Sequence, residues 1–179
     1  MRILWWLVLF QVGRVMAQEQ GTQETKALEL LTFRKMVSVA YEGYQIRYEH
    51  FKNVKETWVV PTVFAFSRYR MRPETLKKRG FSDQDRWVFD IGFSGYWVAH
   101  PTLFIGMGAK VPLGYERVRE YSGVRRSKFL IGLGLQQGVR WVASEDWGLV
   151  LGVHSSQYLM NSEVTRGGIR WEFEVGIQF

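Results

Sequence analysis

The chain contains no cysteine among its 179 residues. Disulfide bridges, thiolate metal sites, a cysteine nucleophile and a lipid-modified N-terminal cysteine are therefore excluded. Long apolar runs are also missing, since residues 3–10 form the longest and a membrane-spanning helix needs roughly 20 apolar residues. Only 4 prolines are present, whereas aromatic residues make up 16% of the chain and 18 glycines are spread along it. This mixture favours a β-rich fold over a helical bundle.

The first 17 residues have the pattern of an export signal. Arg2 provides a positive charge, residues 3–10 form an apolar stretch, and Val15-Met16-Ala17 is a small-residue cleavage site. The alternative is a transmembrane anchor, for which the apolar stretch is too short. We therefore predict a signal peptide at residues 1–17, with Gln18 as the first residue of the mature chain.

The C-terminal segment, residues 169–179, alternates strictly between apolar and polar or small residues. Period-two alternation is typical of a β-strand with two different faces. The apolar positions are Ile169, Trp171, Phe173, Val175, Ile177 and Phe179.

The same alternation recurs upstream and predicts further strands. Seven are readable, at residues 44–51, 57–70, 86–98, 102–113, 127–141, 147–159 and 168–179. Single-chain bacterial barrels have an even number of strands, so we place an eighth at residues 33–41, with its turn at Glu42-Gly43. Residues 18–32 are expected to form a periplasmic tail with a short helix at 27–31. The predicted fold is all-β, an eight-stranded antiparallel up-and-down transmembrane β-barrel over residues 33–179.

The polar face of these strands carries charges in mid-strand. Charges are costly against lipid, whereas inside a narrow barrel they can pair with one another. A balanced set predicts a packed polar interior. It therefore disfavours one possible function of such a barrel, that of a small pore. The eight predicted interior charges are Arg47, Glu49, Asp90, Lys110, Arg140, Arg170, Glu172 and Glu174.

Tryptophan spacing supports a membrane-facing apolar wall. Trp87 and Trp97 share one face ten residues apart, which is about 25 Å along the membrane normal at ~3.3 Å per residue and ~40° tilt. That separation matches an apolar band between two aromatic girdles. Short and long connections also alternate along the chain, as periplasmic turns and external loops do in outer-membrane barrels. The predicted girdle residues are Trp87, Trp97, Trp141, Trp147 and Trp171.

With these features the chain resembles the small bacterial outer-membrane β-barrel proteins of the eight-stranded, porin-like superfamily. The C-terminal strand resembles the signal that the barrel-assembly machinery reads. The resemblance implies export, assisted insertion and location in the outer membrane, and it implies no particular activity. The residues of this insertion signal are Phe173, Val175, Ile177 and Phe179.

One constellation gives an enzymatic alternative. Outer-membrane lipid A deacylases are eight-stranded barrels with a His-x-Ser pair on a late strand, and here His154 and Ser156 have that spacing. A serine becomes a nucleophile when histidine takes its proton and a carboxylate orients the histidine. This chain has Gln157 where the family usually has Asn, and Arg170 where its carboxylate would align, with Glu172 two residues on. By parity, His154 and Ser156 also face the interior, away from lipid.

Other chemistry has little support in the sequence. His50, His100 and His154 lie on separate predicted strands or turns, so we expect no metal site and no cofactor. The chain carries a net charge of +7, and two predicted outer loops, residues 70–86 and 114–128, are basic. In an exported protein this charge favours phosphates of lipopolysaccharide over nucleic acid. We expect a monomer with a structural, adhesive or envelope-interaction role, whose basic loop residues include Arg117, Arg119, Arg125 and Arg126.

Overall fold

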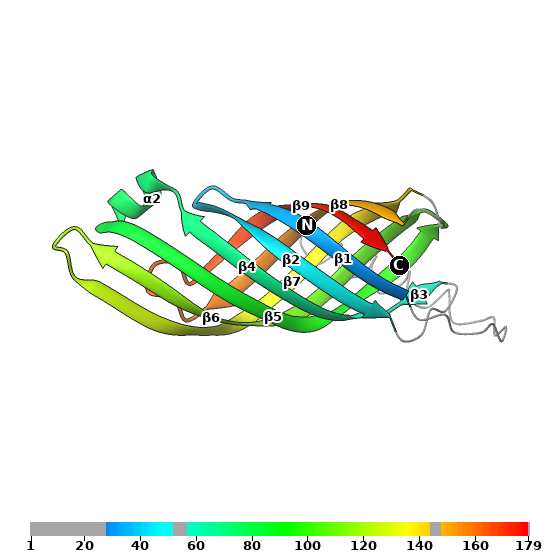
Figure 1. The fold of residues 1–179 in the computed structure, drawn as a ribbon, viewed down its shortest axis with the longest axis horizontal. Coiled ribbons are helices and arrows are strands. Elements are labelled where there is room, and N and C mark those ends of the chain that lie inside the picture. The colour runs from blue at the N-terminus through cyan, green and yellow to red at the C-terminus, as the bar shows by residue number, and fades with distance from the viewer. Residues whose placement is uncertain (1–27, 52–56, 144–147, 179) are drawn as a thin grey trace, which may run out of the picture.

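The computed structural model describes residues 28–51, 57–143 and 148–178 (Figure 1). The predicted signal peptide and the residues up to 27 lie outside this described part. One short helix, α2, accompanies nine strand segments. These are β1 (Leu28–Val37), β2 (Tyr41–Phe51), β3 (Trp58–Val59), β4 (Thr62–Met71), α2 (Pro73–Lys78), β5 (Phe81–His100), β6 (Leu103–Glu120), β7 (Arg125–Val142), β8 (Leu149–Met160) and β9 (Gly167–Gln178).

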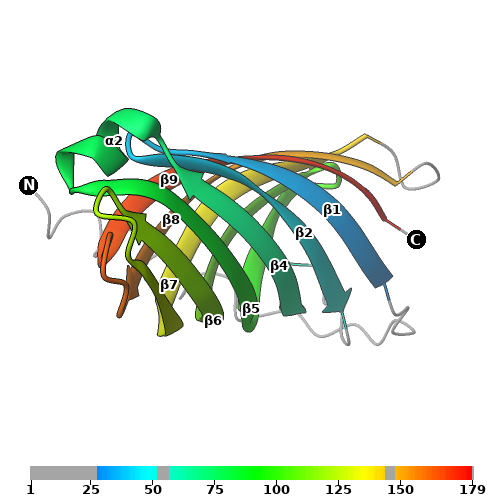
Figure 2. The same ribbon diagram turned by 60° about the vertical axis from the view of Figure 1, so that its left-hand side comes forward.

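The strand segments form a closed, eight-stranded antiparallel barrel, as predicted. The short β3 and β4 both pair with β5, so they are two parts of one interrupted strand. The break between them falls at Val60 and Pro61, and proline has no N–H for the ladder. Every other strand pairs with its chain neighbours, and β1 pairs with β9 to close the cylinder. Figures 1 and 2 show the strands tilted around a common axis, with α2 beyond one end.

The first hairpin differs from the prediction. Strand β1 begins at Leu28 and the turn lies at residues 38–40 rather than at Glu42-Gly43. Residues 28–31, where a tail and a short helix were expected, belong to β1. Ser38 explains the shift, because its hydroxyl accepts hydrogen bonds from the backbone N–H groups of Ala40 and Tyr41. This local side-chain turn replaces the glycine turn that we predicted.

Gly43 has a different role, inside the wall rather than in a turn. It lies opposite Tyr69 of β4, and a Cβ atom at this position would lie 2.8 Å from the Tyr69 Cβ. The absence of a side chain lets the ring of Tyr69 pack inside the barrel next to Tyr41. Glycine in a strand often marks such a close approach.

The outer connections are shorter than predicted, because β5, β6 and β7 continue far beyond the apolar wall. Residues 81–85 and 114–120, expected in loops, are paired strand. The outer face of these extensions carries charged residues and their buried inner face is largely polar, so the alternation of apolar and polar residues that reveals a strand is lost there. The remaining outer connections are residues 38–40, the segment containing α2, residues 121–124 and residues 161–166.

Side chains inside the barrel form two small apolar layers with a charged layer between them, and a third apolar cluster of Met71, Leu76, Val118 and Val164 lies at the mouth beside α2. One layer, around Met36, Tyr41 and Tyr69, lies toward the end that carries α2. The other, around Leu30, Tyr96 and Val150, lies toward the opposite end. Within the described ranges, no helix is long and apolar enough to span a bilayer.

Candidate functional site

The outside wall of the barrel is apolar over most of its surface. Large side chains such as Phe93, Leu133 and Phe173 are exposed by half or more on this wall. Among the predicted girdle residues, Trp87, Trp141 and Trp171 are exposed on the wall and Trp97 is half-buried, while Trp147 lies outside the described residues. Phe173, Val175 and Ile177 of the predicted insertion signal also face outward, and Phe179 is not among the described residues. A wall of this kind is stable in hydrocarbon rather than in water.

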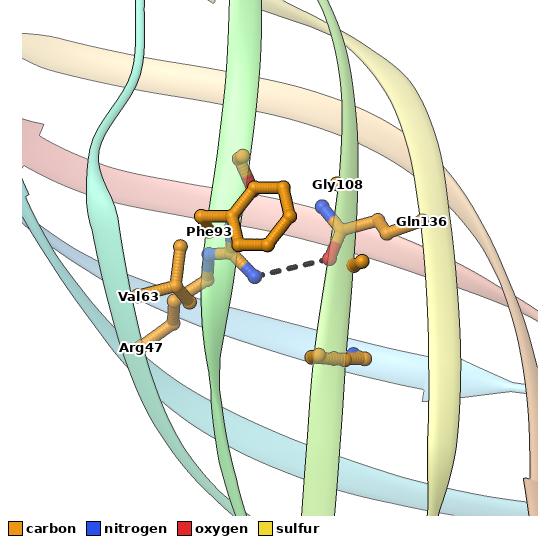
Figure 3. A pocket seen from close by; sticks show the side chains of 8 residues that line it. Arg47, Val63, Phe93, Gly108 and Gln136 are labelled. Carbon is orange, nitrogen blue, oxygen red and sulfur yellow. Dashed lines mark hydrogen bonds between the residues drawn. The ribbon is translucent and has the colours of Figure 1, made fainter.

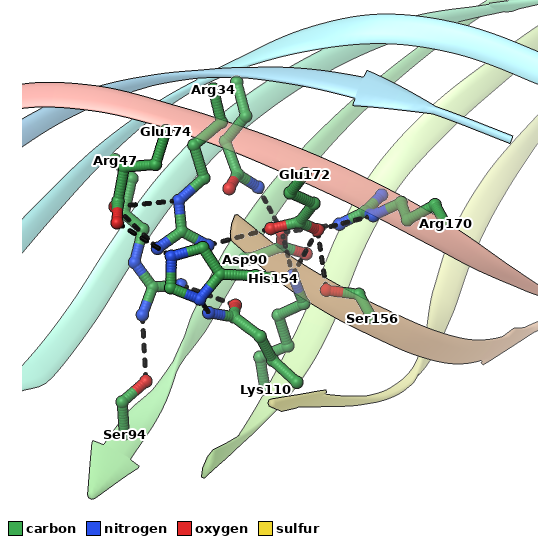
Figure 4. Close-up of polar contacts among 12 residues, drawn as sticks. Arg34, Arg47, Asp90, Ser94, Lys110, His154, Ser156, Arg170, Glu172 and Glu174 are labelled. Atoms are coloured by element: carbon green, nitrogen blue, oxygen red, sulfur yellow. Dashed lines mark hydrogen bonds and ion pairs between the residues drawn. The ribbon is translucent and has the colours of Figure 1, made fainter. Parts of the chain in front are cut away.

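The polar side chains of the strands point into the lumen, where they form one charged layer (Figure 4). We call this layer the lumen network. All eight charges that the sequence places inside the barrel are buried in it, and each of them takes part in at least one ion pair.

The centre of the lumen network lies across the β1–β9 seam. Arg34 of β1 contacts Glu172 at 2.8 Å and Glu174 at 2.7 Å, both on β9. Arg140 of β7 reaches the same Glu174 at 3.0 Å and Glu49 of β2 at 2.9 Å. These bridges link the first, second and last strands with β7, so the network ties together parts of the chain that are far apart in sequence.

The remaining charges attach to this centre. Lys110 contacts Asp90 at 3.4 Å, and Arg170 contacts Glu172 at 2.7 Å. Arg47 binds Glu49 and donates to neutral groups as well. Its partners are the hydroxyl of Ser94 at 2.8 Å and the side-chain oxygen of Gln136 at 3.0 Å.

Sequence reasoning missed several members of the lumen network. Arg34 was missed because the first strand has the weakest alternation, and residues 18–32 next to it were taken for a tail. Uncharged polar residues such as Gln45 and Gln136 were missed because a search for mid-strand charges passes over them. Parity along β7 could have found Gln136, since it lies four residues before Arg140.

The lumen has little free space. A gap between Arg47, Ser94, Gly108 and Gln136 (Figure 3) has no room for a water molecule. Above and below the lumen network, the two apolar layers fill the cross-section. The described residues therefore form a packed interior, which is the arrangement that disfavours conduction.

His154 and Ser156 both lie in this packed lumen, yet each serves a different carboxylate. The Nε2 of His154 lies 2.7 Å from Glu174, and the hydroxyl of Ser156 donates to Glu172 at 2.6 Å. In the described part of the chain no hydrogen bond joins the two, so the structure does not form the serine–histidine pair of a hydrolase. Both side chains are buried and point away from the lipid-facing wall. Among the described residues, no group of three His, Asp or Glu could hold a metal ion.

A second site lies on the outer wall, just above the aromatic residues of the β6–β7 hairpin. Arg117, Arg119 and Arg125 are exposed on the wall side of this hairpin, and Arg117 stacks 5.5 Å over the ring of Tyr115. We call these three arginines the outer arginine cluster. Arg126 points instead toward the mouth of the barrel, where it pairs with Glu120 at 2.7 Å. Of the four arginines that the sequence placed in the basic outer loops, three therefore lie on the wall and Arg126 lies in the mouth.

The mouth itself is held together by Glu116. This carboxylate binds Arg86 and accepts hydrogen bonds from the hydroxyl of Ser162 and the backbone N–H of Glu163 in the β8–β9 connection. Burial acts to raise the pKa of Glu116, but the guanidinium of Arg86 and the hydrogen bonds hold that pKa below its usual value. Beside this anchor lies a hollow of about 630 Å³, lined in part by Lys128 and Arg166.

Solved structures with the same fold are outer-membrane barrels of about this length. The attachment invasion locus protein of Yersinia pestis is 13% identical, covers 88% of this chain and 100% of its own, and has a TM-score of 0.55. Neisserial surface protein A is 16% identical, with 87% and 98% covered and a TM-score of 0.52. The N-terminal β-barrel domain of Pseudomonas aeruginosa OprF is 11% identical, with 88% and 100% covered and a TM-score of 0.51.

These likenesses establish the fold. The chain has the architecture of the small eight-stranded outer-membrane β-barrels, as the alternation of its strands predicted. No protein-family model matches the sequence, and no curated protein matches it either.

Proposed function

We propose that the chain is an integral protein of the bacterial outer membrane with a non-enzymatic, envelope-interaction role, and that its outer arginine cluster binds phosphates of lipopolysaccharide. The apolar wall and packed lumen support a barrel that resides in the bilayer and does not conduct. The outer arginine cluster supplies cations directly above the apolar wall, where phosphate groups of neighbouring lipids lie.

The observation that carries the proposal is a pair of like charges. Arg119 of β6 and Arg125 of β7 lie directly opposite each other on the same face of the hairpin. Like charges in this position destabilise a strand pair. Asp83 of β5 lies opposite Arg119 on its other side, but among the described residues neither arginine forms an ion pair. A phosphate between two guanidiniums would remove the repulsion and provide strong bidentate hydrogen bonds.

The position of the outer arginine cluster fits this ligand. Arg117 lies two residues beyond Tyr115 on the same face of β6, and Tyr115 is exposed on the apolar wall. Two residues correspond to about 5 Å along the membrane normal at this tilt. The guanidiniums therefore lie at the level where the glycolipid head group begins.

Binding to purified lipopolysaccharide tests the proposal. The protein is refolded in phosphatidylcholine vesicles, and its affinity is measured by titration with labelled lipopolysaccharide. We expect the triple variant Arg117→Gln, Arg119→Gln, Arg125→Gln to lose about tenfold or more in affinity, because charge-assisted hydrogen bonds contribute about 1.5–3 kcal/mol each.

A control with the same change in charge separates geometry from net charge. Arg72, Lys77 and Lys78 are exposed basic residues of the α2 segment, and changing all three to Gln should leave the affinity nearly unchanged. The single change Arg126→Gln should also have little effect, because this side chain faces the mouth. If both triple variants lost the same affinity for lipopolysaccharide, or if neither lost any, the outer arginine cluster would not be the binding site.

The alternatives have their own tests. Incubation with labelled lipopolysaccharide, comparing wild type with Ser156→Ala, should release no fatty acid from either protein; release by wild type alone would favour the deacylase reading. Planar-bilayer recordings test the pore reading, and we expect no steady conductance because the lumen network fills the cross-section.

A further inference from the structure

One part of the lipid-facing wall is polar. Gln137 of β7 and Ser155 of β8 lie directly opposite each other, and Gln157 lies two residues further along β8 on the same face. Gln137 and Gln157 are exposed, and Ser155 is half-buried. We call these three residues the wall polar patch. β7 and β8 run side by side in Figure 1, so the patch is continuous across the two strands.

The wall polar patch lies well inside the apolar band. Along β7, Gln137 is four residues from Trp141 and eight from Phe129, both exposed on the same face. At ~3.3 Å per residue and ~40° tilt, Gln137 lies about 10 Å from the level of Trp141 and about 20 Å from that of Phe129. Water at the interfaces is therefore out of reach of its short side chain.

The three side chains find no partner within the barrel. In the part of the chain that the structure describes, none of them makes a side-chain hydrogen bond. Polar groups left unpaired in hydrocarbon are costly, and those found in transmembrane segments usually bind one another across an interface. Lys35 on β1 is also exposed on the wall, but its long side chain can extend toward the nearby turn at residues 38–40. A glutamine cannot do this.

We propose that the wall polar patch is the interface of a homodimer within the membrane, in which the β7–β8 faces of two copies pack around a two-fold axis along the membrane normal. This differs from the monomer that the sequence led us to expect. Such an axis relates each residue to its own copy at the same depth. Gln137 of one copy therefore faces the wall polar patch of the second copy at the same depth in the bilayer. At this depth the side-chain amides of both copies need hydrogen-bond partners.

Amide chemistry favours a second copy as the occupant. Each glutamine carries two N–H donors and a carbonyl acceptor, so two identical amides can satisfy each other reciprocally. The neighbouring wall residues, including Leu135, Val139 and Val153, are aliphatic and carry no charge that would repel an identical face. A different protein would need its own polar group at this depth.

Cysteine cross-linking gives a direct test, because the chain has no cysteine of its own. The single variant Ser155→Cys, which keeps both glutamine amides, is refolded in phosphatidylcholine vesicles at low protein density and oxidised with a membrane-permeant catalyst. Phe64→Cys is the matched control, since Phe64 is exposed on the wall of β4, three strands away from β7 and four from β8 in the barrel. We expect a disulfide-linked dimer from Ser155→Cys and none from the control.

Leucine substitutions show whether the amides cause the association. In the Ser155→Cys background, Gln137→Leu with Gln157→Leu should abolish the dimer band while the barrel stays folded, as a boiled and unboiled gel comparison reveals. Gln137→Met provides the same test should the double variant fail to fold. Cross-linking no greater than that of Phe64→Cys, or a dimer that persists without the amides, would overturn the proposal.

Discussion

At the scale of single residues, the fold depends on where each charge can find a partner. Parity along the strands was enough to place Asp90, Arg140 and Glu174 on one side of the wall, because alternation fixes the face of every residue in a strand. It could not show which charges meet, since those contacts join strands through the barrel closure. The Arg34–Glu174 contact at 2.7 Å is such a case.

A carboxylate at the centre of the lumen network gives a clear test. Glu174 binds Arg34, Arg140 and His154, so Glu174→Gln leaves two buried guanidiniums short of negative charge. Breaking a buried ion pair by removing one partner typically costs about 3–5 kcal/mol. We expect a loss of unfolding free energy of that size, measured by urea titration of the protein in vesicles.

The control for this loss is Glu29→Gln. The side chain of Glu29 is 40% exposed, and its carboxylate lies 3.7 Å from the Nδ1 of His50 at the end of the barrel opposite α2. Exposed ion pairs contribute at most about 1 kcal/mol to stability. Similar losses in the two variants would mean that the lumen network does not stabilise the barrel more than a surface pair does.

At the scale of elements, the strongly alternating strands were predicted well and the irregular ones were not. The last strand was expected at residues 168–179 and is observed as Gly167–Gln178. The first strand was misplaced, because the Ser38 turn has no signal as strong as a glycine pair. The outer extensions of β5 and β6 were taken for loops, since cross-strand partners such as Asp85 and Arg117 give no apolar periodicity.

The outer connection between β8 and β9 should loosen in acid. Because the pKa of Glu116 is lowered in the folded state, its contribution to stability is fully present above its unfolded pKa of about 4.3 and is lost as pH falls through the folded value. We therefore expect hydrogen-exchange protection of the Val164 and Thr165 amides, which Ser162 holds, to fall below about pH 4.

Glu116→Gln supplies the comparison. In this variant the two amides should be poorly protected already at neutral pH, and acid should change them little. Protection that falls equally steeply in the variant would assign the acid response to another group.

At the scale of the whole molecule, the barrel has inverted polarity compared with a soluble protein. Ionic groups fill the middle of the lumen, and side chains such as Ile91, Leu133 and Phe173 form the outside. Sequence alone revealed both faces, and the mid-strand charges decided which one points inward, since charge against lipid is costly. The pairing of β1 with β9 then closes the wall, so no strand edge is left in the hydrocarbon.

The most direct measurement of this inverted polarity compares the folded state with and without a bilayer. The purified chain from residue 18 onward is diluted from urea into phosphatidylcholine vesicles or into buffer alone, and boiled and unboiled samples are run on a denaturing gel. Only the unboiled vesicle sample should show the altered migration of a folded barrel. A chain that folds and stays dissolved in buffer without any amphiphile would contradict the account.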